Sequence, residues 1–432
     1  MNRILIKEAK KQGQGEVSLA GFVRNQRALK GLIFTVLSDL SDSIQLVIEE
    51  KSEAVYNQAL TLNLESVIEV SGTLQPKPVK AGMTPDFELL VTDLKILSLA
   101  KEQLPIPVLA KVDNQADFDL RLNWRFLDLR RSENQLIFKV WTEFEKGFRE
   151  YFASADYLQI YTPTFMSTAS ETGADVFEVK YFDKKAYLAQ SPQFYKQMAM
   201  ASGLEKVFMV GTVYRAEKSF TNRHVTEFTG WDFEISYIDS EETIMVEEEK
   251  MIVAGFKNIK DNLGLDIVVP DRPFPRLTLA QAKEKLVVAG IKGEAIDDLN
   301  PEEERGICEI IKQETGNDFV FITAYPISVR PFYHARREDD NSLTKSYDLL
   351  YKGIEVTTGA VREHRIEVLE KQALEKGMNL EELADYLNFF RYGCPPHGGA
   401  GIGPARIVMK LLDLSNIKEA VFLPRDVKRL VP

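Results

Sequence analysis

The chain has 432 residues and a net charge of −11, from 54 lysines and arginines against 65 aspartates and glutamates. Its length suggests two or three domains. Its acidic balance argues against a polybasic nucleic-acid binder, although an acidic body can still carry one basic face. No apolar run approaches the roughly 18 residues that cross a bilayer, and residues 1–17 lack the apolar stretch of a signal peptide. Cys308 and Cys394 form no CxxC pair, so we expect free thiols and a cytoplasmic protein.

Residues 1–100 are predicted to be mainly β-structure. Short runs rich in apolar and β-branched residues are bounded by Gly, Ser, Asp or Pro, and a helical stretch separates the third run from the fourth. The runs are residues 17–23, 32–39, 43–50, 66–74 and 87–97. Five strands with a helix after the third predict an OB-type Greek-key barrel, in a pattern that other small β-barrels share.

Residues 101–119 carry two prolines and no clear periodicity, which predicts a linker. Beyond it, residues 120–432 mix helical and strand-like runs without a regular βαβ rhythm. This pattern favours an α+β domain on an antiparallel sheet over a doubly wound one. Its first helix is predicted over residues 133–152, where apolar side chains recur every three or four positions, at Ile137, Val140, Trp141, Phe144, Phe148, Tyr151 and Phe152.

The usual nucleotide-binding glycine motifs are missing from the sequence. It contains neither GxxxxGK[ST] nor a strand-linked GxGxxG with its acidic partner, so P-loop and Rossmann binding are not supported. The glycine cluster at residues 398–403 (GGAGIG) is predicted to be a turn.

A charged segment, residues 213–236, lies between two strand-like runs. Its functional side chains are Arg215, Glu217, Arg223, His224, Glu227, Phe228 and Asp232. One interpretation is a charged hairpin with solvated tips. The other is a hairpin that binds a polyphosphate and a base, because Arg donates two hydrogen bonds to phosphate, an aromatic ring offers a stacking face and Glu accepts from an exocyclic amine.

This segment resembles motif 2 of the class II aminoacyl-tRNA synthetases. RAEKSFTNRHVTEFTGWDFE is similar to the aspartyl-tRNA synthetases of archaeal and eukaryotic type. Residues 156–165 resemble motif 1, whose proline, here Pro163, lies at a dimer interface. Residues 401–409 resemble motif 3, which contains Arg406. Further segments match the aspartate enzymes, and the resemblance covers essentially the whole chain; these segments are residues 186–200, 351–365 and 391–399.

The resemblance implies an ATP site. Arg215 would bind the α-phosphate and Glu217 the adenine amino group, and Phe228 would stack on the adenine with Arg406 on its other face. Arg215 and Arg406 would then be the catalytic cations. The remaining implied ligands are Arg223 and His224 for the distal phosphates and Asp348, Glu355 and Thr358 for Mg²⁺, a cation that prefers oxygen ligands.

The resemblance also implies how aspartate and tRNA bind. Lys196 and Arg362 would pair with the substrate side-chain carboxylate, and asparagine would be rejected because it leaves these cations poorly paired. Glu171, Gln193 and Asp232 would bind the ammonium group. Anticodon contacts would come from Arg24, Phe34 and Gln45, although from the strand pattern alone Phe34 is better explained as a barrel-core aromatic.

The implied protein is a homodimeric class II aspartyl-tRNA synthetase with an OB-fold anticodon-binding domain (1–100), a linker (101–119) and a catalytic domain (120–432). It would use ATP and Mg²⁺ to charge the tRNA for aspartate, and possible charging of the tRNA for asparagine is left open. Two alternatives stay open: a tRNA-independent ligase that makes asparagine, and a catalytically silent tRNA-binding relative. The second is suggested by Ala405, where motif 3 usually has Glu, and by Pro404 before it.

Overall fold

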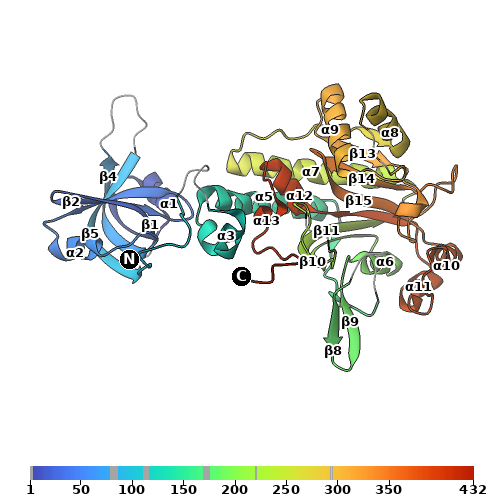
Figure 1. The fold of residues 1–432 in the computed structure, drawn as a ribbon, viewed down its shortest axis with the longest axis horizontal. Coiled ribbons are helices and arrows are strands. Elements are labelled where there is room, and N and C mark those ends of the chain that lie inside the picture. Colours follow the sequence, from blue (N-terminus) through green and yellow to red (C-terminus); the bar gives the residue numbers. More distant parts are fainter. Residues whose placement is uncertain are drawn as a thin grey trace. The chain divides into compact units, whose positions relative to one another are not determined.

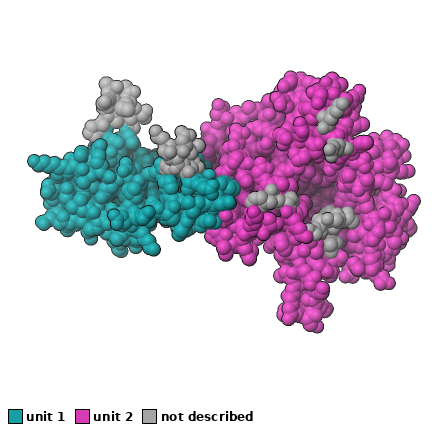
Figure 2. Space-filling view, in the orientation of Figure 1, with its two compact units in different colours: residues 1–135 teal, residues 136–432 magenta. Residues whose placement is uncertain are grey.

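The computed structural model describes residues 3–77, 86–109, 116–168, 176–218, 221–291, 293 and 295–432. The chain divides into two compact units, residues 1–135 and 136–432, which Figure 2 draws in different colours. Each unit has its own hydrophobic core, so each is described by itself.

The first unit is a closed five-stranded barrel. Its strands follow the order β1 (Gly15–Leu29), β2 (Leu32–Ser38), β3 (Ser43–Glu49), β5 (Asp86–Ser98) and β4 (Val67–Lys77). Neighbouring strands are antiparallel except β3 and β5, whose parallel pairing completes the barrel. Helix α2 (Glu53–Leu60) follows the third strand, so the predicted OB-type order is confirmed; the other helices of this unit are α1 (Ile6–Gln12), α3 (Phe118–Asn123) and α4 (Arg125–Asp128).

Alternation along β2 decides which side chains fill the barrel. Ile33 and Leu37 are fully buried in its core, whereas Phe34 and Val36 are only partly buried. Because successive side chains of a strand point to opposite faces, Phe34 lies on the outer face of the barrel. The interpretation of Phe34 as a core aromatic is therefore wrong.

The second unit is built on an eight-stranded sheet (Figure 1). Its strand order is β12 (Arg276–Thr278), β13 (Phe319–Thr323), β14 (Ser346–Tyr351), β15 (Ile354–Arg362), β16 (His397–Ile402), β11 (Glu227–Ser236), β10 (Lys206–Tyr214) and β6 (Leu158–Gln159). The pairs are antiparallel except the outermost pair on each side. This confirms the predicted α+β fold class.

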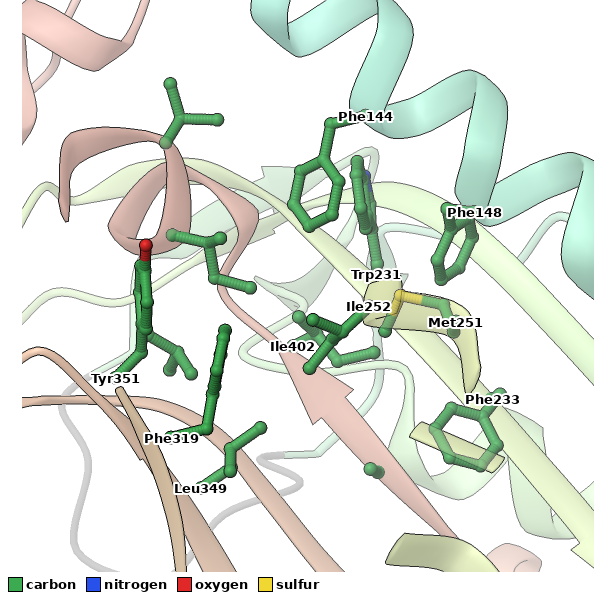
Figure 3. Close-up of a cluster of buried hydrophobic side chains, with 14 of the residues drawn as sticks. Phe144, Phe148, Trp231, Phe233, Met251, Ile252, Phe319, Leu349, Tyr351 and Ile402 are labelled. Carbon is green, nitrogen blue, oxygen red and sulfur yellow. The ribbon is translucent and has the colours of Figure 1, made fainter. Parts of the chain in front are cut away.

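One face of this sheet is covered by helices. The long helices α5 (Ser132–Ser154) and α7 (Glu241–Leu263) cross at two glycines, where a Cβ on Gly147 would lie 2.6 Å from Cα of Gly255. Only glycine allows two helices to approach so closely. Side chains of both helices and of the sheet form one hydrophobic core. Figure 3 shows Phe144 and Phe148 of α5 around Trp231 of β11, with ring centroids 4.8 and 4.5 Å from the indole.

The predicted turn at residues 398–403 is wrong, because most of this glycine cluster forms strand β16 in the middle of the sheet. Glycine is required there by crowding. A Cβ at Gly399 would lie 2.0 Å from the Phe233 carbonyl oxygen, and one at Gly398 would lie 2.7 Å from that of Ala360. The neighbouring backbones leave no room for side chains at these positions.

The remaining elements surround the sheet. A small sheet pairs β7 (Phe165–Met166), β9 (Lys184–Leu188) and β8 (Glu178–Tyr181). The other helices are α6 (Gln193–Ala201), α8 (Leu279–Val288), α9 (Pro301–Thr315), α10 (Ile366–Glu375), α11 (Ala384–Arg391), α12 (Pro404–Leu411), α13 (Ile417–Ala420) and a short 3₁₀ helix, η2 (Ile327–Val329). No helix in the described part of the chain is both long and apolar enough to cross a membrane.

Candidate active site

A cavity of about 270 Å³ opens on the sheet face opposite the helical core. Strand β11 shows why the two faces differ, because its residues alternate between them. Trp231 and Phe233 enter the helical core, whereas Gly230 and Asp232 face the cavity. Most of the predicted ATP and aspartate ligands line this cavity: Gln193, Lys196, Arg215, Glu217, Arg223, His224, Phe228, Asp232, Glu355, Thr358, Arg362 and Arg406.

Some predicted residues lie elsewhere. Asp348 is buried beside the cavity without lining it. Pro163 lines a second cavity of about 130 Å³, next to the largely exposed Tyr161. Glu171 lies outside the described residues. Arg24, Phe34 and Gln45 belong to the barrel unit.

At the end of the cavity where the sequence predicts the aspartate ligands, two cations share one fully buried carboxylate. Glu234 accepts from Arg362 Nε at 3.0 Å and lies 3.3 Å from Lys196 Nζ. Lys196 also pairs with Asp232 at 2.8 Å. Burial alone would raise the pKa of Glu234, but the adjacent Arg362 and Lys196 outweigh it and hold that pKa below its ordinary value.

This pairing corrects the expected basis of selectivity. Lys196 and Arg362 were predicted to be left poorly paired when asparagine replaces aspartate. Both cations already have carboxylate partners within the protein, Asp232 and Glu234, so an uncharged substrate side chain would not leave them unpaired. Glu234 was not predicted to be a site residue, although Asp232 and Glu234 alternate with Phe233 on one strand, which is a signal for two acids on one face.

Arg362 is also held by groups that were not predicted to be site residues. Its Nη1 donates to His334 Nε2 at 3.0 Å and its Nη2 to the Gly399 carbonyl at 2.9 Å. His334 is buried, lines the cavity, and has a pKa well below its ordinary value because of burial and the adjacent Arg362. No spacing in the sequence connects His334 to Arg362, because the two lie on paired segments far apart along the chain.

The end of the cavity where the sequence predicts the ATP ligands is more open. The hairpin register pairs Val213 with Phe228, and Arg215, two residues after Val213, lies with its guanidinium 5.5 Å from the Phe228 ring centroid. Arg215 is 3.9 Å from Glu217, and both side chains are substantially exposed. Arg406 donates to the Glu355 carbonyl at 2.9 Å. This anchor comes from β15, so the orientation of Arg406 does not depend on a glutamate at the position of Ala405.

Of the two predicted distal-phosphate residues, Arg223 contacts helix α9. Arg223 pairs with Glu304 at 2.6 Å, and burial raises the pKa of Glu304 to about 7 although Arg223 opposes the shift. His224 contacts Thr221 at 2.6 Å, and burial and the nearby Arg406 lower its pKa. A neutral His224 can accept or donate a hydrogen bond without adding charge.

The predicted magnesium ligands come from neighbouring strands. Asp348 of β14 pairs with Thr358 of β15 in the sheet register, and Thr358 Oγ1 lies 3.4 Å from Glu355 Oε1. Asp348 Oδ2 accepts from Arg330 at 2.6 Å, while its buried Oδ1 has no hydrogen-bond partner. The described residues contain no group of three or more His, Cys, Asp or Glu that could hold a metal by itself. Two carboxylates and a hydroxyl suit Mg²⁺ that completes its shell with phosphate and water.

On the barrel, Phe34 and Gln45 share the outer face of β2 and β3. Phe34 has the Arg27 guanidinium 5.6 Å from its ring centroid, and Gln45 donates to Glu88 at 3.0 Å. Arg24 is different: it is buried, and its Nη1 lies 2.8 and 2.7 Å from the two Glu65 oxygens. The anticodon role of Arg24 stays a prediction, and it requires this pair to rearrange.

Comparisons with known proteins cover both units. The model of the class II tRNA synthetases (D, K and N) matches residues 117–427, and that of the OB-fold nucleic acid binding domain matches residues 17–97. The chain is 40% identical to an aspartate--tRNA(Asp/Asn) ligase of Aeropyrum pernix over 97% of this chain and 96% of the relative. It is 37% identical to an aspartate--tRNA(Asp) ligase of Pyrococcus abyssi over 96% of each.

A solved structure gives the same result for the fold. Asparaginyl-tRNA synthetase from Pyrococcus horikoshii, complexed with asparaginyl-adenylate, superposes with a TM-score of 0.90 at 29% identity, over 100% of both chains. The matched models, the identity over nearly the whole length and the shared fold agree. The chain belongs to the class II tRNA synthetases of the aspartate, lysine and asparagine group, in the aspartate--tRNA ligase family.

Proposed function

We propose that this chain activates L-aspartate with ATP to form aspartyl-adenylate and transfers the aspartyl group to the 3′-terminal ribose of tRNA. The observation that carries the proposal is one cavity with two chemically different ends. The buried cluster of Lys196, Asp232, Glu234 and Arg362 suits an amino acid with a second carboxylate. The open end, with Arg215 beside Phe228, suits a base and its phosphates.

The chemistry needs positioning more than proton transfer. The α-carboxylate of aspartate is already ionised, so its oxygen can attack the α-phosphorus without a general base, and pyrophosphate leaves. Arg215 and Arg406 would stabilise the charge that builds on the phosphate oxygens. Asp348, Glu355 and Thr358 would hold Mg²⁺, which when bound neutralises phosphate charge.

ATP–pyrophosphate exchange with aspartate, asparagine and lysine tests the activation step. We expect exchange with aspartate and none above background with the other two. Exchange that prefers asparagine would contradict the assignment of the cluster. No exchange with any amino acid would favour the silent tRNA-binding alternative, against which the Glu355 anchor of Arg406 already argues. Transfer of labelled aspartate to tRNA then separates this enzyme from a tRNA-independent ligase.

We further propose that the enzyme aspartylates the tRNAs for both aspartate and asparagine. The two anticodons share their first two bases, so a discriminating enzyme needs a contact to the third base. Arg24, at the relevant position, is engaged by Glu65 and by the Arg130 carbonyl, which leaves it poorly suited to separate cytosine from uracil. The expected result is a ratio of kcat/KM for the two tRNAs below about a hundredfold, or roughly 2.7 kcal/mol, at one salt concentration. A larger preference would contradict the proposal.

We also propose a cytoplasmic homodimer that contacts its partner around Pro163. The exposed Tyr161 and Phe165 flank Pro163 at one end of the small sheet. Sedimentation equilibrium should give twice the chain mass. Tyr161→Glu should shift the protein toward the monomer, because a charge in an apolar contact is costly to desolvate. A wild-type chain that sediments as a monomer would contradict the assignment.

A further inference from the structure

Behind the wall of the cavity lies a chain of buried hydrogen bonds. It runs from Gln193, the first residue of α6, to Gln197 one turn later, and from there to Tyr386 of α11 and His397 of β16. All four side chains are buried, and only Gln193 lines the cavity. The other three residues were not assigned any role from the sequence.

The donors and acceptors in this series of hydrogen bonds can be assigned by starting from His397. His397 Nδ1 lies 2.8 Å from the Pro395 carbonyl oxygen. A carbonyl can only accept, so Nδ1 carries the proton. Burial lowers the pKa of His397 to about 4, so the ring is neutral at physiological pH and Nε2 has a lone pair. The neighbouring contact, from His397 Nε2 to Gln197 Nε2 at 3.0 Å, must therefore have Gln197 as the donor.

The orientation of Gln197 then determines that of Gln193. With its nitrogen toward His397, Gln197 directs its oxygen to two donors, Gln193 Nε2 at 3.1 Å and the Tyr386 hydroxyl at 2.9 Å. Gln193 has thus used its amide nitrogen inside the protein. Its Oε1 has no hydrogen-bond partner among the described residues and is not sealed from the cavity. An amide held this way offers the cavity an acceptor and cannot turn to offer a donor.

We propose that His397 is a positioning residue for substrate recognition: through Gln197 it fixes Gln193 with its carbonyl oxygen toward the cavity, where that oxygen accepts from the α-ammonium group of the amino acid. The proposal rests on the proposed aspartate activity. A reversed Gln193 would present N–H groups to the ammonium and repel it. The buried His397 therefore determines whether Gln193 presents an acceptor or a donor to the cavity, although His397 itself does not line the cavity.

The test compares two ligands that differ only in the group concerned. L-Aspartate carries the α-ammonium, and succinate has the same two carboxylates without it. For His397→Leu, we expect the KM for aspartate to rise about tenfold or more, because a hydrogen bond to a charged group is lost. The inhibition constant of succinate in the exchange assay should change less than about twofold, and so should the KM for ATP. Gln197→Leu should reproduce the pattern.

Two further variants separate positioning from general damage. His397→Gln can still accept from Gln197, so it should restore most of the affinity for aspartate. Tyr386→Phe removes only the hydroxyl, so it should fold normally and change the aspartate KM in the same direction by less. His364→Leu is the matched control, because His364 is only partly buried and does not line the cavity, and we expect no change.

The outcomes are distinguishable. If aspartate and succinate lose affinity equally in His397→Leu and Gln197→Leu, or if neither changes while wild-type exchange is normal, the positioning role is wrong. If wild-type protein shows no aspartate-dependent exchange, the proposed function fails instead. Equilibrium binding of both ligands to the wild-type chain and to Tyr386→Phe, measured by calorimetry, then tests the positioning role without turnover, and an unchanged ratio of the two affinities would overturn it.

Discussion

The two ends of the cavity are built differently. At the amino-acid end, Lys196, Glu234 and Arg362 are buried and already joined by ion pairs. At the nucleotide end, the Arg215 and Glu217 side chains are 42% and 33% exposed and lie 3.9 Å apart. A small amino acid must be distinguished from close analogues, which requires groups held rigidly before binding. ATP supplies many contacts of its own, so its residues can adjust as it binds.

The largest expected effect is at the buried end. Arg362→Leu leaves Glu234 without its closer cation, and breaking a buried pair costs about 3–5 kcal/mol. We expect a large fall in thermal stability together with a KM for aspartate that rises far more than the KM for ATP. Calorimetric unfolding and exchange kinetics measure the two effects. A variant that stays as stable as wild type would show that the cluster is not a preformed unit.

At the open end of the cavity, a substitution should lower the exchange rate strongly and hardly affect thermal stability. Arg215→Ala removes one charge donor from the phosphate site, so the exchange rate should fall about 10²–10³-fold. The midpoint of thermal unfolding should hardly change, because a partly exposed ion pair contributes little to stability. Arg425→Ala is the control, because Arg425 forms an isolated bridge with Glu227 and does not line the cavity. Near-normal exchange in Arg215→Ala would remove Arg215 from the site.

A buried carboxylate outside the cavity tests whether ion pairing is what keeps Glu234 ionised. Glu248 of α7 accepts from the Tyr347 hydroxyl at 2.8 Å, and burial raises its pKa from 4.5 to about 7. Below about pH 4.5 the carboxyl is protonated in both states. As the pH rises to 7 and beyond, the unfolded chain ionises first, so stability is lost. Glu248→Gln should therefore gain about 1–3 kcal/mol relative to wild type between pH 5 and 8. An advantage that is independent of pH would contradict this explanation.

The smallest expected effect is at Glu304, which lies between the two types of site because it is buried but pairs with the more accessible Arg223. Glu304→Gln removes the negative charge that pairs with Arg223 but keeps an oxygen that can accept a hydrogen bond from it. We expect the KM for ATP to rise about three- to tenfold and the KM for aspartate to stay the same. A larger effect on aspartate would show that the two ends are coupled through the cavity.

Much of the fold and many of the cavity residues could be predicted from the sequence. Alternation and turn residues identified the five barrel strands, and helical periodicity identified the buried face of α5, because both are local patterns with a fixed period. The resemblance in short motifs named most of the lysine, arginine, aspartate and glutamate side chains that line the cavity. These residues are close in space partly because they are close in sequence, on one hairpin from Arg215 to Asp232.

The tertiary structure alone decided the partners of those side chains. The glycine run at β16 was predicted to be a turn, and its role as a central strand depends on neighbouring backbones that come from distant segments. Glu234 of β11 joins Lys196 of α6 to Arg362 of β15, and these three elements are far apart along the chain. His397 acts on Gln193 through Gln197, although 200 residues separate His397 from Gln197. Sequence patterns carry information about a residue and its near neighbours, whereas hydrogen-bond direction and charge pairing depend on atoms that only folding brings within about 3 Å.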